Sequence, residues 1–129
     1  MLISRVLIGL VLLVNLQCAG VFMIDPAAYM GGFGLEAELG EQMVRAMGLL
    51  FLMWNVPYVF ALIDPRKYRH SLVEAVIMQA IGLVGESAIL LFGGPYAPTI
   101  GSTITRFIIF DGIGLVLLAG ALLKVQIEE

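Results

Sequence analysis

Charged residues are scarce in this chain of 129 residues: they make up only 13% of it, against about 25% in soluble domains. Seven residues are basic and the net charge is −3, so the basic surface with which proteins bind nucleic acid is missing. The single cysteine, Cys18, and the single histidine, His70, exclude an internal disulfide, a cysteine-based metal cluster and a histidine cluster. The sequence also has no Ser-His-Asp set and no glycine-rich phosphate loop, which disfavours an enzyme and predicts neither a cofactor nor a metal.

Apolar residues dominate instead, at 60% of the chain with a mean hydropathy of +1.01. A body of this size cannot bury so much apolar surface away from water, so the sequence indicates an integral membrane protein. Crossing a bilayer takes about 20 apolar residues of helix, and four segments are long enough: residues 2–24, 42–63, 71–93 and 102–124. Because an open sheet would leave backbone groups unpaired in lipid, we predict an all-α bundle of four transmembrane helices, with residues 1–129 forming one domain.

The positions of the basic residues predict the orientation of this bundle. Arg66, Lys67 and Arg69 lie between the second and third segments, and Arg5 and Lys124 mark the two terminal ends. Four spans place all these positions on one side of the membrane, which the positive-inside rule makes cytoplasmic. Both termini are therefore predicted to be cytoplasmic, in a multi-pass protein of a prokaryotic inner or plasma membrane.

An alternative for the first segment is a signal peptide, because Arg5 precedes an apolar run from Val6 to Val14, and Cys18-Ala19-Gly20 follows it. In a lipoprotein Cys18 would carry the lipid, but Gln17 stands where a small residue is expected. A retained span fits better, since only four helices place all the basic terminal and loop residues on one side of the membrane.

Polar side chains inside the apolar segments are the candidate site. An ionisable group in a span costs roughly 2.5–3.5 kcal/mol on insertion scales, so such groups normally face protein or water. A rise of about 1.5 Å per residue places the charged ones and Asn15 in one layer of the outer half of the membrane, with two further amides near its middle. The candidate residues are Arg45, Glu86, Arg106, Asp111, Asn15, Asn55 and Gln79.

Two arginines and two carboxylates at a common depth form a neutral set, which is the least costly way to hold charges in a membrane. The simplest interpretation is a network of intramembrane salt bridges that fixes the bundle. A ligand or ion site on the same residues, and arginine side chains that reach to the membrane surface, are the alternatives.

Proline and aromatic residues add local expectations. Pro57 removes a backbone donor and should leave the carbonyl of Met53 unpaired, which predicts a kink near Asn55. Trp54 lies too deep for the membrane interface and is expected to pack inside the bundle, whereas four tyrosines are expected to anchor at the interface: Tyr58, Tyr68, Tyr29 and Tyr96.

Short motifs along the chain resemble the DoxX-like group of small four-helix bacterial membrane proteins. The motifs are Asp25-Pro26 before a glycine-rich loop, Arg45-Ala46-Met47-Gly48 opening the second span, and Arg106 followed by Phe110-Asp111-Gly112 in the fourth. The resemblance implies a four-helix bundle with Arg45, Arg106 and Asp111 at pattern positions. In some members it implies a supporting role beside membrane oxidoreductases that handle quinones.

Two functions remain open on this evidence. The first is a non-enzymatic membrane protein, either an accessory or structural subunit of a membrane complex or a self-associating bundle, whose partners are lipid and other membrane subunits or further copies of itself. The second is a binder or carrier of a small lipophilic molecule or ion that uses the polar cluster in the outer half of the membrane.

Overall fold

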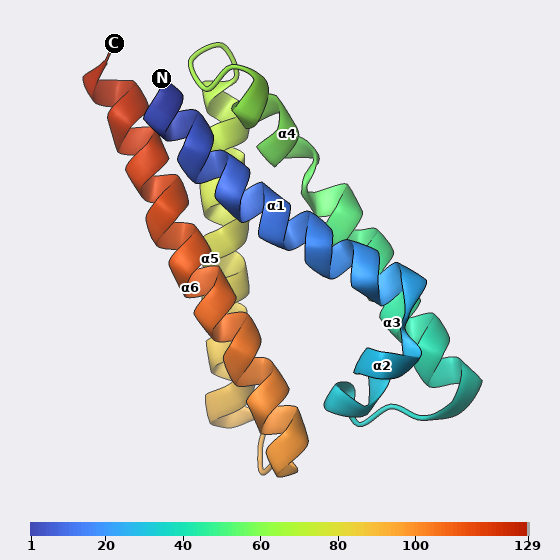
Figure 1. Ribbon diagram of the computed structural model, residues 1–129. Coiled ribbons are helices and arrows are strands. Elements are labelled where there is room, and N and C mark those ends of the chain that lie inside the picture. The colour runs from blue at the N-terminus through green and yellow to red at the C-terminus, as the bar shows by residue number, and fades with distance from the viewer. Residues whose placement is uncertain (129) are drawn as a thin grey trace.

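The computed structural model describes residues 1–128, and every regular element within them is helical (Figure 1). Four stretches of this part are long and apolar enough to cross a membrane. Their bounds are Leu2–Ile24, Ala37–Ile63, Arg69–Phe92 and Pro98–Ile127. The predicted all-α architecture is confirmed, with four helical stretches that could each span a membrane, and the last three begin two to five residues before the predicted starts. Large side chains point outward along them, among them Leu91 and Val116 with 73% and 71% of their surface exposed, as expected of a multi-pass membrane protein.

The second span is broken at Asn55 into α3 (Ala37–Trp54) and α4 (Val56–Ile63), which confirms the predicted kink. Pro57 has no N–H with which to bond the carbonyl of Met53. The backbone N–H of Asn55 turns to the carbonyl of Leu52, at 3.3 Å. The side-chain amide of Asn55 then donates to the carbonyl of Phe51 at 2.6 Å, so the residue at the break satisfies a backbone group that the break would leave unpaired.

Helix α1 (Leu2–Ile24) runs through the middle of the molecule and packs on α3, α4 and α6 (Pro98–Ile127). Helix α5 (Arg69–Phe92) packs on α4 and α6. In Figure 1, α3, which precedes the break, leans away from α5 and α6. The helices are therefore close together at the end that holds α4 and splayed at the opposite end. The fully buried core lies at the close end and includes Ile8, Ala61, Leu72, Ala75, Leu118, Ala121 and Val125. Its alanines let the helix backbones approach one another.

The segment between α1 and α3 reaches across the splayed end. It holds the short helix α2 (Ala27–Met30) and the 3-10 turn η1 (Gly31–Phe33), and η1 packs on α6. A Cβ on Gly32 would lie 2.8 Å from the hydroxyl oxygen of Thr103 on α6. Gly34, with φ +68°, adopts the left-handed conformation that ends the turn. This segment therefore connects α1 and α3 to α6 where the helices themselves diverge.

The two ends of the molecule carry different charges. The end that holds both termini and the turn between α4 and α5 carries Arg5, Arg66, Lys67, Arg69 and Lys124, and we call it the cationic end. The opposite end, with α2 and η1, carries Asp25, Glu36, Glu38 and Glu41, and we call it the acidic end.

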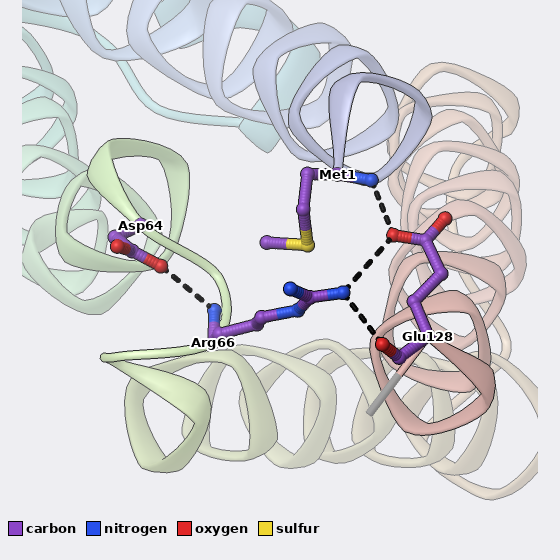
Figure 2. Close-up of polar contacts among 4 residues, drawn as sticks. All are labelled: Met1, Asp64, Arg66 and Glu128. Carbon is purple, nitrogen blue, oxygen red and sulfur yellow. Dashed lines mark hydrogen bonds and ion pairs between the residues drawn. The ribbon is translucent and has the colours of Figure 1, made fainter.

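Hydrogen bonds and ion pairs tie the cationic end together (Figure 2). Arg66 donates to the backbone carbonyl of Glu128 at 2.6 Å and lies 3.7 Å from its carboxylate, which also meets the amino group of Met1. The bond from that amino group holds the pKa of Glu128 below its ordinary 4.5. Asp64 accepts bonds from the backbone N–H groups of Lys67 and Arg66, both at 3.0 Å, which hold its pKa below 3.8.

The packing of α3 on α1 depends on Gly48. A Cβ there would come 2.8 Å from the carbonyl oxygen of Ala19 and from Cγ of Met23. We expect Gly48→Ala to lower the free energy of unfolding by about 1–3 kcal/mol, because two helices would be pushed apart. The matched control is Gly85→Ala on α5, where no atom lies within 4 Å and helix propensity should raise stability by up to about 1 kcal/mol. SDS-titrated unfolding in micelles, followed by circular dichroism, measures both. Equal losses would contradict the close crossing of α1 and α3.

Acid should destabilise the cationic end. The lowered pKa values of Asp64 and Glu128 mean that both carboxylates bind protons more readily in the unfolded chain. The two carboxylates therefore contribute their full stabilisation above about pH 4.5. This stabilisation is lost as the pH falls through their pKa values in the folded protein. We expect the unfolding free energy to fall below pH 4.5 in the wild type and to fall less steeply in Asp64→Asn combined with Glu128→Gln. Parallel curves for the two proteins would show that these contacts contribute nothing.

Candidate functional site

A cavity of about 740 Å³ lies in the acidic half of the molecule, between α1 and α3 on one side and α5 and α6 on the other. The space lies where α3, on the N-terminal side of the break at Asn55, diverges from α5. Six of the seven candidate residues line it: Asn15, Asn55, Gln79, Glu86, Arg106 and Asp111. Cys18, Gln17 and Tyr58 line it as well. The structure therefore brings polar side chains from all four spans to one space, whose role is still a prediction.

A chain of side-chain hydrogen bonds links three of the spans beside this cavity. The hydroxyl of Tyr58 on α4 donates to the amide oxygen of Gln79 on α5 at 2.7 Å. The amide nitrogen of Gln79 in turn donates to Asp111 on α6 at 2.9 Å. The bonds run in one direction and end on a carboxyl oxygen, so the chain leads from a buried hydroxyl to an acceptor.

A second pair joins α1 to the break in the second span. Asn15 donates to the side-chain oxygen of Asn55 at 2.9 Å, while the nitrogen of Asn55 is bound to the carbonyl of Phe51. The exposed fraction of Asn55 is only 4%. Because unpaired amides are costly in an apolar surrounding, this pair fixes both the break and the position of α1 beside it.

Glycines let the polar side chains of α5 and α6 meet. A Cβ on Gly82 would overlap the carboxylate of Asp111, and a Cβ on Gly114 would overlap the amide of Gln79. Asp111 therefore lies directly over α5, where its carboxyl group neighbours that of Glu86. The Oε2 atom of Glu86 is buried and has no hydrogen-bond partner among the described residues.

The predicted intramembrane salt bridges are not formed. Within residues 1–128, the ion pairs are those at the cationic end, and none joins Arg45 or Arg106 to Glu86 or Asp111. Arg45 lies off the cavity and donates to the carbonyl of Met23 at 3.3 Å, in the last turn of α1, where a cation is favoured by the helix dipole.

Arg106 lines the cavity, but its side chain is exposed. It precedes Asp111 by five residues, which places the two side chains about 140° apart around the helix. The two side chains therefore point in different directions, and no ion pair forms between them among the described residues.

Aromatic rings form the wall of the cavity towards the acidic end, and the sequence analysis missed them. Phe107 on α6 has its ring centre 6.3 Å from Phe22 on α1, 6.0 Å from Phe33 in η1 and 6.1 Å from Phe51 on α3. Since one ring comes from each of four elements, no helical spacing signals the cluster.

Two further aromatic predictions need correction. Tyr58 is not an interface anchor: only 3% of its surface is exposed, and its hydroxyl is held by Gln79 and, at 3.3 Å, lies near the carbonyl of Ala75. Its place in the Tyr58–Gln79–Asp111 chain explains this burial. Trp54 lines the cavity, yet half of its surface is exposed, so it packs at the edge rather than inside the bundle.

A smaller cavity of about 190 Å³ adjoins the large one. Met47 of α3 and Ile89 of α5 line it, and it shares Phe33, Phe51, Glu86, Thr103 and Phe107 with the large cavity. It thus continues the same space towards α3 and α5.

The chemistry of the lining suits binding. Within the described residues, no group of three or more histidine, cysteine or acidic side chains is placed to hold a metal ion. The lining combines a few convergent polar groups with many apolar and aromatic ones, which is the usual composition of a small-molecule site.

We expect the contact between Tyr58 and Gln79 to be measurable as an interaction energy. In a double-mutant cycle of Tyr58→Phe and Gln79→Leu, the two losses should be non-additive by about 0.5–2 kcal/mol. A cycle of Arg106→Gln and Asp111→Asn should be additive to about 0.5 kcal/mol, because those side chains form no ion pair. Both cycles use SDS-titrated unfolding. A coupling in the arginine cycle as large as in the first would restore the salt-bridge interpretation.

Comparison with known proteins leaves the site to be interpreted on its geometry. No protein-family model, no curated protein and no solved structure matches this chain. The resemblance to DoxX-like proteins is accordingly neither supported nor contradicted, and it stays a prediction.

Proposed function

We propose that this protein is a multi-pass membrane protein that binds a small lipophilic molecule with a polar group, in the cavity between α1, α3, α5 and α6. The observation that carries the proposal is the cavity itself: about 740 Å³ in volume, it falls within the range of roughly 300–1,000 Å³ typical of small-molecule sites. A bundle whose polar residues served only to hold the helices together would have no need of such a space, since protein interiors are close-packed.

The distribution of polar groups supports an amphipathic ligand. The aromatic rings of Phe22, Phe33, Phe51 and Phe107 gather towards the acidic end, whereas Asn15, Asn55, Tyr58 and Gln79 lie nearer the middle of the spans. A ligand with an apolar body and one polar group would meet both. The small cavity between α3 and α5 would let it enter sideways from the bilayer rather than from water.

Orientation and location belong to the same proposal. We place the cationic end in the cytoplasm, with both termini, because five of the seven basic residues lie there and the positive-inside rule counts such residues. The cavity then opens in the outer half of a prokaryotic inner membrane. A role as an accessory subunit of a membrane complex is compatible with this site, since a subunit can bind a ligand for its partner.

Trp54 offers a native reporter, since it is the only tryptophan and lines the cavity. We expect 4-bromophenol, a lipophile with one hydroxyl, to quench its fluorescence in a saturable way in detergent micelles. Cys18→Phe should abolish the saturable part by filling the cavity. The matched control, Ala88→Phe on the exposed face of α5, should keep it. Linear quenching, equal in all three proteins, would overturn the proposed function.

A further inference from the structure

Two neighbouring carboxyl groups lie on the inner part of the cavity, and no ion pair joins either of them to a cation among the described residues. Glu86 on α5 and Asp111 on α6 are neighbours there, and the buried Oε2 atom of Glu86 has no partner within residues 1–128. Arg106 remains exposed, about five residues nearer the acidic end than Asp111. The inner part of the site therefore holds two neighbouring acids, and Arg106, the one cationic side chain among the described lining residues, forms an ion pair with neither.

The amide and hydroxyl groups near these carboxyl groups bond to one another and to the backbone. The amide nitrogens of Asn15, Asn55 and Gln79 donate to Asn55, Phe51 and Asp111 respectively, as the preceding distances show. The hydroxyl of Tyr58 donates to Gln79. The bonds of this network run towards Asp111, whose carboxyl group is their final acceptor, and a ligand with a donor or a positive charge would complement that group.

The surrounding rings favour the same kind of ligand. Phe51 lies at the centre of a group of rings: its centre is 5.8 Å from Phe22, 5.7 Å from Trp54 and 6.1 Å from Phe107. The face of an aromatic ring attracts a cation within about 6 Å of its centre, and more strongly when water is excluded. An anion would meet both the faces of these rings and the two carboxyl groups.

From these three observations we infer that the ligand of this cavity is a lipophilic organic cation, an amine or quaternary onium group on an apolar body. Its positive charge lies against Glu86 and Asp111, and its apolar body lies among the rings of Phe22, Phe51 and Phe107. The inference rests on the proposed function and narrows the class of its ligand.

Two probes of the same shape and opposite charge test this inference: tetraphenylphosphonium and tetraphenylborate. Equilibrium dialysis of the radiolabelled ions is carried out on full-length protein in dodecyl maltoside, with empty micelles subtracted. We expect saturable, one-to-one binding of the phosphonium and only micelle partitioning of the borate. Equal or tighter binding of the borate would overturn the inference.

Matched variants locate the charge. Glu86→Gln and Asp111→Asn should each weaken phosphonium binding about tenfold, because a charge-assisted contact is lost. Glu74→Gln, on an exposed position of α5 outside the cavity lining, should leave it unchanged. Phe107→Leu, which keeps both acids, should weaken it about two- to fivefold through the lost ring. Unaltered phosphonium binding in both acid variants would also overturn the inference. If an acid variant fails to fold, the Phe107 variant and the comparison of phosphonium with borate still test whether the ligand is a cation.

The outcomes separate this inference from the proposed function. Saturable quenching by 4-bromophenol with no phosphonium binding would reject a cationic ligand and leave the lipophile site standing. Failure of both probes would reject the two together.

Discussion

The break in the second span at Asn55 determines the shape of the acidic half of the molecule. Without the break, residues 37–54 would continue along the axis of α4, which packs on α5. Pro57 prevents this, because it cannot donate to the carbonyl of Met53. Helix α3 then packs on α1 instead, through Gly48, and the space left between α3 and α5 becomes the cavity. The cost of the break is limited, since the side chain of Asn55 satisfies the carbonyl of Phe51.

Polar groups in a membrane span have to be satisfied inside the protein, and this requirement organises the interior around the cavity. The bonds of Tyr58, Gln79 and Asp111 join α4, α5 and α6 where the packing of apolar side chains thins out. Gly82 and Gly114 make these contacts possible by removing side chains from the crossing of α5 and α6. The Oε2 atom of Glu86, which has no hydrogen-bond partner within residues 1–128, belongs to a residue that lines the cavity.

Much of the candidate site could be predicted from residue type and depth. Polar residues in spans face inward for energetic reasons, so six of the seven predicted side chains do line one cavity. Their partners could not be predicted, because partners depend on rotation about each helix axis. Arg45 was expected beside a carboxylate and instead binds a carbonyl at the end of α1. The ring cluster of Phe22, Phe33, Phe51 and Phe107 was missed for a related reason: its members share no helix.

The sequence by itself determined the all-helical architecture, the number of helical stretches long and apolar enough to cross a membrane, and the position of the kink. These follow from local properties: apolar length against bilayer thickness, and the missing donor of Pro57. Only the tertiary structure decided that Tyr58 is buried rather than interfacial, that Glu86 and Asp111 face each other rather than an arginine, and that a cavity separates α3 from α5. The physical reason is that contacts between helices depend on how each is rotated and tilted against its neighbours, and packing of whole surfaces, not residue order, sets those angles.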